Sequence, residues 1–221
     1  MLRPLTLLAA LVGGAFLSSC SSTTGSSVRV MSRADSTQLV GLFGGGQTGA
    51  VGLPAEPSAK VANAAAGLPR DRHGMPRYAQ SERSRLVRTT AFSCKENEPG
   101  AYKNLNATGT ELRYTSNIRS AAADWSRYPL GTKFKIKGLP YTYIVDDYGS
   151  GLVGAGTLDI YHPCLESMRA WGTRKAEVTV IQWGSFERSA ALLSRRQQYP
   201  HCHAMYAAIL RQHGSQVAMS R

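Results

Sequence analysis

Two aspartates, Asp147 and Asp159, lie at the two ends of a glycine-rich segment that is bordered by short apolar stretches. Carboxyl groups act as general acids and bases when their surroundings raise the pKa toward neutrality. A third aspartate, Asp124, ends a run of three alanines. Three aspartates at predicted strand ends around one glycine turn indicate an acid catalyst on a rigid frame rather than a solvated face. Asp146, next to Asp147, is expected to be a surface charge.

The elements that would position these acids are short β-branched or aromatic runs bounded by turn residues. Their spacing predicts a small closed β-barrel of about 100 residues, which is long enough to bury one core. Residues 133–137 alternate strictly, so Lys133 and Lys135 should point outward, and Phe134 and Ile136 inward. The predicted strands are residues 87–92, 133–136, 141–145, 158–161 and 178–183. We therefore predict a mainly β domain over residues 86–186.

Two helical regions accompany the predicted strands. Residues 163–171 have apolar side chains at helical spacing and are followed by Gly172, which predicts a helical insert. Residues 187–221 form a predicted C-terminal helical tail, broken at Pro200 and ended at Gly214. This tail is expected to cover one face of the barrel.

The motifs occur in a fixed order along the chain: Ala-Ala-Ala-Asp124, Pro129-Leu-Gly-Thr132, Asp147-Tyr-Gly-Ser-Gly, Asp159-Ile-Tyr161 and Trp171-Gly172. In this order they resemble the three-aspartate (3D) domain, over roughly residues 88–184. That domain forms the C-terminal half of membrane-bound lytic transglycosylase A and also occurs in small muralytic proteins. The usual DxGG motif is replaced here by Asp147-Tyr-Gly-Ser-Gly, and the turn before Asp159 is slightly longer.

The resemblance implies a six-stranded double-psi β-barrel and cleavage of the β-1,4 bond between muramic acid and glucosamine in peptidoglycan. It assigns the acid/base role to Asp159, whose pKa Asp147 and burial would raise, and gives Asp147 an orienting or tuning role. Asp124 is either a third site residue or the cap of a turn. For Asp159 itself, the structural alternative is a strand-end aspartate that caps backbone amides.

Four further residues beside the acids are candidates for binding the sugar. The rings of Tyr148 and Tyr161 are suited to stacking on a sugar, or equally to packing in the barrel. Gly149 and Gly151, with the neighbouring glycines, would give positive φ and leave open space for a glycan. His162, close in sequence to Asp159, could assist the acid, and exposure in a turn is the simpler alternative.

The chain begins with a segment that is typical of export. A basic residue, a short apolar stretch and small residues before Cys20 predict a lipoprotein signal peptide over residues 1–19. Lipid on Cys20 would anchor the protein in the bacterial envelope, at the outer membrane facing the periplasm, because serines rather than aspartate follow Cys20. An unmodified Cys20 after ordinary secretion is the alternative. Residues 20–85, rich in Ser, Gly, Ala and Pro, predict a disordered tether.

The net charge of +12 favours anionic partners such as wall peptides or lipid headgroups. Nucleic acid is not expected as a partner, because the chain is exported. We expect a monomer without cofactor or metal, since His201-Cys202-His203 has no second group at ligand spacing. An exported protein permits a disulfide, either Cys94–Cys164 or Cys164–Cys202, and we favour the second.

The hypothesis that the protein is an enzyme has two alternatives. The first is a non-catalytic peptidoglycan-binding lipoprotein whose aspartates hold glycan hydroxyls. The second is a barrel that docks onto another envelope protein.

Overall fold

The computed structural model describes residues 52–96 and 104–219. The chain divides into two units, Met1–Thr48 and Gly49–Arg221, and the described residues belong to the second unit. The predicted signal peptide (1–19), Cys20 and the first part of the predicted tether (20–51) lie outside the described residues.

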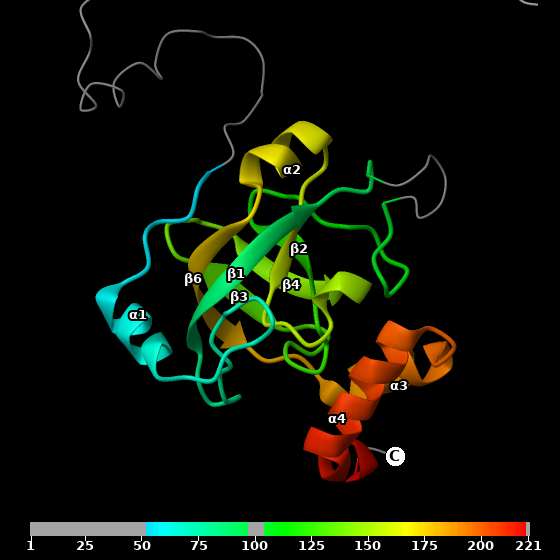
Figure 1. The fold of residues 1–221 in the computed structure, drawn as a ribbon. Helices are drawn as coiled ribbons and strands as arrows, with labels where there is room; N and C mark the ends of the chain where they lie inside the picture. Colours follow the sequence, from blue (N-terminus) through cyan, green and yellow to red (C-terminus); the bar gives the residue numbers. More distant parts are fainter. Residues whose placement is uncertain (1–51, 97–103, 220–221) are drawn as a thin grey trace, which may run out of the picture. The chain divides into compact units, whose positions relative to one another are not determined.

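Six strands form a closed barrel in the order β1-β5-β2-β4-β3-β6, and β6 pairs with β1 to close it (Figure 1). The pairs β1/β5 and β2/β4 are parallel, and the other four are antiparallel. The strands are β1 (Ser84–Phe92), β2 (Ile118–Ala123), β3 (Lys133–Ile136), β4 (Thr142–Asp147), β5 (Leu158–Tyr161) and β6 (Arg174–Gln182). The prediction of a mainly β, six-stranded barrel with helical additions is confirmed.

Alternation along the strands builds the barrel core, as predicted for β3. Phe134 and Ile136 are fully buried, whereas Lys133 and Lys135 are only partly so. The Phe134 ring stacks on Tyr143 of β4, with ring centroids 5.2 Å apart. Because side chains of a strand point alternately to the two faces, the same alternation places functional groups on the outside.

Asp124 was expected at a strand end, but the strand before it, β2, is not among the predicted strand ranges because three of its six residues are alanines, which have low β-propensity. In the barrel β2 pairs with β5 on one side and with β4 on the other. Its alanines are almost completely buried, so small side chains suit the crowded position between two other strands. Packing rather than propensity makes this segment a strand.

Residues 52–83, called the N-terminal segment below, are ordered and lie against the barrel, so the predicted disordered tether is wrong for this part of the chain. Helix α1 (Ala59–Ala66) begins at Ser58, whose hydroxyl accepts a hydrogen bond from the amide of Val61 at 3.4 Å. The Ser58 amide donates to Glu177 Oε2 of β6 at 2.6 Å. The contacts of this segment are made by its backbone amides, which leave no hydrophobic pattern in the sequence. Composition alone therefore suggested a flexible tether.

The N-terminal segment also contacts the turn after β3. The amide of Ala55 donates to the carbonyl of Lys137 at 2.9 Å. Gly138 in this turn has φ +85°, and a Cβ there would lie 2.6 Å from the Ala55 nitrogen. Only glycine therefore allows the segment to approach the barrel so closely.

The helical predictions are largely confirmed. The helices after the N-terminal segment are α2 (Leu165–Trp171), α3 (Phe186–Leu193) and α4 (Pro200–Met219), with a 3-10 turn at Ser194–Arg196. Helix α4 begins at the predicted break and continues past the predicted stop at Gly214, with non-helical backbone at His213. Within residues 52–96 and 104–219, no helix combines the length and the apolar character needed to cross a membrane.

The three cysteines of the described residues are free, so both predicted disulfide pairings are wrong in this structure. Cys202 is fully buried on α4 with Met205 and Ile209, as part of the hydrophobic core. Cys164, in contrast, is exposed just before α2. The tail is thus held by hydrophobic packing instead of by a covalent link.

Candidate active site

The two strongest candidate acids lie in one row across the barrel. In the strand register Ala122 of β2 is paired with Asp159 of β5 on one side and with Asp147 of β4 on the other. Paired residues on neighbouring strands point to the same side of a sheet. The two carboxylates therefore share a face, roughly 10 Å apart at Cα across two interstrand spacings. The small side chain of Ala122 lies between them. We call these three residues the aspartate row.

A β-bulge in β4 determines which aspartate enters this row. Ala121 is paired with Val145 but Ala122 with Asp147, so Asp146 is an extra residue in the strand. A bulge of this kind redirects the side chains that follow it. Without the bulge, Asp146 would face Ala122 in place of Asp147.

Asp146 is not the surface charge that the sequence predicted. Its side chain is buried, and Oδ2 accepts a hydrogen bond from the Ser120 hydroxyl at 2.7 Å. Burial raises the pKa of Asp146, and the Ser120 bond lowers it in part. Regular alternation predicted exposure, and the bulge removes that regularity.

Asp159 has the environment of a general acid. One oxygen, Oδ1, accepts a hydrogen bond from the Thr90 hydroxyl at 2.5 Å, and Thr90 is paired with Asp159 across β1 and β5. Among the described residues, Oδ2 has no hydrogen-bond partner. Burial raises the pKa of Asp159 to about 6, with a further rise from the Glu96 carboxylate. Thr90 and Arg88 act in the opposite direction. Glu96 is thus a like charge beside Asp159 that the sequence did not predict, in addition to Asp147, which interacts with the Asp159 charge.

Asp147 is held more tightly than Asp159. Its Oδ1 accepts hydrogen bonds from the amides of Ala107 at 3.1 Å and Tyr148 at 2.9 Å. Burial raises the pKa of Asp147 to about 6, and the charges of Asp146 and Asp159 contribute to the rise. Asp147 therefore fixes the loop around Ala107 beside the row, which fits an orienting role.

Asp124 does not join the row. Its Oδ1 accepts hydrogen bonds from the Ser126 amide at 2.8 Å and the Ser126 hydroxyl at 2.7 Å. Its Oδ2 accepts one from the Gly154 amide at 2.7 Å. The side chain is only 1% exposed. These contacts support the alternative in which Asp124 caps a turn and fastens the glycine-rich segment to the end of β2.

The glycine-rich segment is less unusual in backbone conformation than the sequence predicted. Of its four glycines only Gly154 has a positive φ, at +78°. Gly149 is extended, with φ −141°, and precedes a 3-10 turn at Ser150–Leu152 that includes Gly151. A Cβ at Gly151 would meet no atom within 4 Å. The space that was expected for a glycan is thus present at Gly151, and its use remains a prediction.

The N-terminal segment holds the glycine-rich segment from outside. Asp71 Oδ2 accepts a hydrogen bond from the Gly156 amide at 2.8 Å, and Arg72 donates to the carbonyl of Gly151. Arg127 donates to the carbonyl of Gly154 at 3.2 Å. The turn between the two acids is therefore fixed by residues that lie far away in sequence.

Tyr148 and Tyr161, the predicted stacking residues, are both engaged in packing. The Tyr148 hydroxyl accepts a hydrogen bond from Arg196 at 2.9 Å, and its ring meets Trp125 edge-on at 4.9 Å. Tyr161 is 4% exposed and lies 3.7 Å from the Cys94 sulfur through its hydroxyl. The packing alternative is thus the better supported one for both rings.

His162 is not exposed in a turn, as the sequence suggested, but fully buried. Neither ring nitrogen has a hydrogen-bond partner among the described residues. Burial, with the charges of Arg119 and Arg174, lowers the pKa of His162 to about 4. The imidazole is therefore neutral at physiological pH and packs against Trp171.

Three contributors to the site were missed from the sequence: Thr90, Ala107 and Arg196. Thr90 reaches Asp159 only through the strand register. Arg196 donates to the carbonyl of Ala107 at 2.8 Å and so connects the tail to the loop that Asp147 holds. No local sequence pattern marks these partners, because each contact joins distant segments.

Comparison with known proteins identifies the central part of the barrel. Residues 119–182 match the family model of the 3D domain, as the order of the motifs predicted. This family is associated with lytic enzymes that act on peptidoglycan. The match covers less than half of the chain, runs from β2 to β6 and includes the whole aspartate row. A comparison with curated proteins found no match.

Proposed function

Because residues 119–182 form a 3D domain, we propose that this protein is a lytic transglycosylase that cleaves the β-1,4 bond of peptidoglycan glycan strands. Asp159 is the acid/base in this proposal. The supporting observation is its setting: Thr90 fixes one carboxylate oxygen, and the other has no partner among the described residues. With its pKa raised to about 6, a useful fraction of Asp159 carries a proton near neutral pH.

The proposed reaction needs one carboxyl group in two successive roles. Protonated Asp159 first gives its proton to the glycosidic oxygen, and the bond to C1 of muramic acid breaks. The resulting carboxylate then takes the proton of the C6 hydroxyl, whose oxygen attacks C1. The product is a 1,6-anhydro sugar, and Asp159 recovers its proton. No water is consumed.

Asp147 has an orienting role in this scheme, because its carboxylate accepts hydrogen bonds from sugar hydroxyls. Its distance from Asp159 also defines a hydrolytic variant of the proposal. Inverting glycosidases keep their carboxyl groups about 6.5–9.5 Å apart, which leaves room for a water molecule. The Cα atoms of Asp147 and Asp159 are roughly 10 Å apart, and side chains at this spacing can bring their carboxyl groups into that range. Hydrolysis would then use Asp147 as the base.

The test is digestion of purified sacculi by the full chain, with mass spectrometry of the products. Anhydro-muramyl products from the parent and none from Asp159→Asn are the expected result. Asp146→Asn is a matched control, since it removes a neighbouring buried carboxylate that lies outside the row. Reducing-end sugars from the parent, lost in Asp147→Asn, would replace the transglycosylase with a hydrolase.

A second candidate is a peptidoglycan-binding protein without catalysis. One observation favours it: Asp147 and Asp159 line neither of two cavities in the described part, about 260 and 180 Å³ in volume. An open site of this kind would grip a glycan weakly. This candidate predicts that the protein sediments with sacculi, releases no sugar, and still sediments after Asp159→Asn.

We also propose a lipid anchor at Cys20, which places the barrel, as a monomer, at the outer membrane facing the periplasm. The support is the signal-like sequence before Cys20 and the serines after it. Metabolic labelling with an alkyne fatty acid should mark the parent protein but not Cys20→Ser. Release of the labelled parent into the soluble fraction would contradict the anchor.

A further inference from the structure

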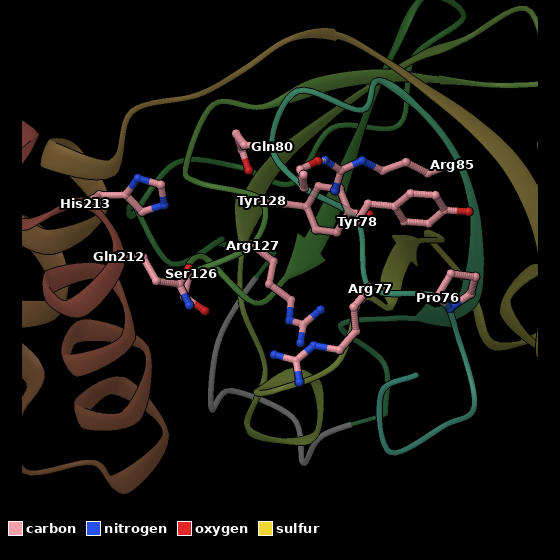
Figure 2. Close-up of a pocket in the computed structure, with 12 residues that line it drawn as sticks. Pro76, Arg77, Tyr78, Gln80, Arg85, Ser126, Arg127, Tyr128, Gln212 and His213 are labelled. Atoms are coloured by element: carbon pink, nitrogen blue, oxygen red, sulfur yellow. Dashed lines mark hydrogen bonds between the residues drawn. The ribbon is translucent and has the colours of Figure 1, made fainter. Parts of the chain in front are cut away.

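A cavity of about 260 Å³ lies away from the aspartate row, between the N-terminal segment, the turn after β2 and helix α4 (Figure 2). Three arginines line it, and each comes from a different element: Arg77 from the N-terminal segment, Arg85 from β1 and Arg127 from the turn. Figure 2 shows the side chains of Arg77 and Arg127 extending toward one another. The convergence of like charges calls for a compensating partner.

The guanidinium of Arg85 is already held by hydrogen bonds within the protein. Its Nε donates to the carbonyl of Glu82 at 2.7 Å, and its Nη2 donates to the carbonyl of Ala79 at 2.8 Å. The guanidinium also lies 5.3 Å from the ring centroid of Tyr128 and 4.8 Å from that of Trp183. Arg85 thus supplies a fixed positive charge at the wall of the cavity rather than free donors.

Arg77 and Arg127 keep donors available. Arg127 makes one hydrogen bond, to the carbonyl of Gly154 at 3.2 Å. The exposed side chain of Arg77 forms no hydrogen bond or ion pair with any described residue. Burial and the nearby charge of Arg77 lower the pKa of Arg127, so the two guanidinium groups repel each other across the cavity. An anion between them would remove this repulsion.

The acids near Arg127 do not fill this role. Asp71 and Asp124 both act on the Arg127 charge, but their oxygens already accept hydrogen bonds from other groups. Asp71 accepts three, from the amides of His73, Met75 and Gly156. No acidic side chain lines the cavity itself, so its three arginines leave it positively charged and suited to an anion.

We propose that this cavity binds the free carboxylate of a short peptide. Guanidinium groups recognise carboxylate and phosphate equally well by geometry, and the peptide stems of the proposed substrate favour the carboxylate. The volume is slightly below the roughly 300–1,000 Å³ of sites for whole small molecules, so the cavity suits one acidic end group. The half-buried ring of Tyr78 offers apolar surface for the adjoining part of the peptide.

The source of the peptide rests on the proposed function: peptidoglycan carries short stem peptides that end in a carboxylate. Arg127 lines the cavity and also donates a hydrogen bond to Gly154 of the glycine-rich segment. A stem peptide bound at the cavity would therefore position the glycan strand relative to that segment. The inference thus concerns recognition of the substrate, and it does not involve the aspartates of the row.

The test is isothermal titration of the full chain with N-acetyl-D-alanyl-D-alanine, with the same dipeptide as its C-terminal amide, and with inorganic phosphate. Binding of the acid, and at least tenfold weaker binding of the amide and of phosphate, is the expected result. Arg77→Gln and Arg127→Gln should each weaken binding of the acid at least tenfold. Arg169→Gln removes an exposed arginine on α2 and should leave binding unchanged.

The other outcomes contradict the inference. Equal binding of acid and amide would exclude carboxylate recognition, and phosphate binding tighter than the acid would replace the peptide with a phosphate ligand. An equal loss in Arg169→Gln would reduce the effect to general charge. Arg77 is exposed, so Arg77→Gln stays folded and keeps the test valid even where Arg127→Gln does not. Asp159→Asn should bind the dipeptide normally, so failed catalysis and failed binding are separate results.

Discussion

The strands β5, β2 and β4 carry polar residues on both of their faces, and the two faces differ in what those residues do. On the outer face, Ala122 separates Asp159 from Asp147. On the inner face, Arg119 is paired with Tyr143, and its charge acts on His162 just after β5. A small residue occupies the centre of the outer group, and a large cation occupies the centre of the inner one.

The inner group is closed by aromatic rings. The Arg119 guanidinium lies 3.9 Å from the ring centroid of Tyr114 and 3.4 Å from that of Tyr141. Its Nε, the Tyr143 hydroxyl and both nitrogens of His162 are buried without a hydrogen-bond partner among the described residues. Polar groups without partners thus destabilise the inner face, whereas at the outer face an unpartnered carboxylate oxygen is available to a substrate.

The largest expected effect separates the two faces by activity. Asp159→Asn should lower turnover of sacculi at least about 1,000-fold, the upper range for loss of a general acid. His162→Phe, on the inner face, should keep turnover within a few-fold of the parent, because the neutral imidazole does not reach the substrate. Product release measured by mass spectrometry compares them. A comparable loss in His162→Phe would make the inner group part of catalysis.

The two neighbouring alanines of β2 offer a matched pair on opposite faces. Ala122→Val places branched carbons between the two carboxylates and should lower turnover about 10–100-fold through misplaced substrate. Ala121→Val instead overpacks the barrel core and should lower the free energy of unfolding by about 1–3 kcal/mol. Denaturant unfolding and turnover, measured on both variants, should give opposite orders of severity.

Replacing the inner cation should affect stability and one pKa, but not catalysis. Arg119→Met loses contacts with two aromatic rings but also removes the unpartnered Nε, so the free energy of unfolding should change by less than about 2 kcal/mol. The pKa of His162, lowered to about 4 in part by Arg119, should rise. NMR titration of the imidazole measures this change, and an unchanged pKa would show that burial alone sets it.

The raised pKa of Asp159 on the outer face should make the folded protein less stable as the pH rises. The pKa of Asp159 rises from 3.8 to about 6 on folding, so the folded state binds more protons in this window. Its stability therefore falls as the pH rises from about 4 to 6. Asp159→Asn should be more stable than the parent near pH 8, by at most about 3 kcal/mol, and equally stable near pH 3. Thermal unfolding at both pH values tests this.

The smallest expected effect concerns the neighbour of Asp159. The charge of Glu96 raises the pKa of Asp159, so Glu96→Gln should move the upper limb of the pH–activity profile to lower pH. The shift should be less than about one pH unit, because burial is the main cause. An upward shift would mean that Glu96 acts through its hydrogen bond from the Ser93 amide instead.

Much of the barrel follows from local sequence, because strands with one buried face alternate visibly. Lys133–Ile136 and Leu158–Tyr161 are predicted with the bounds that the structure has. The alanine strand β2 could not be recognised in this way. Consecutive alanines show no alternation between buried and exposed faces, and alanine has a low β-propensity. The ordering of residues 52–83 was also missed, because it depends on hydrogen bonds from backbone amides of this segment to groups that are distant in sequence.

The acids themselves were found from the sequence, but their relation to one another was not. Which of Asp146 and Asp147 faces Ala122 depends on one bulge in β4. The partners of Asp159, namely Thr90 and Glu96, lie on or after β1, far from it along the chain. Strand register is a property of the closed barrel, so spacing along the chain identifies the candidate residues but not their contacts.

The closure of the barrel also constrains how the chain folds. Both neighbours of β1 come much later in the sequence: Thr89 is paired with Leu158 of β5, and Ser84 with Thr179 of β6. Pairing between such distant segments is slow, because a long loop must close before the contacts form. Strand β1 thus remains unpaired until the last strand, β6, has been synthesised. A chain of this design therefore leaves both edges of β1 unpaired until residues 158–182 are available, so the barrel closes only after its last strand.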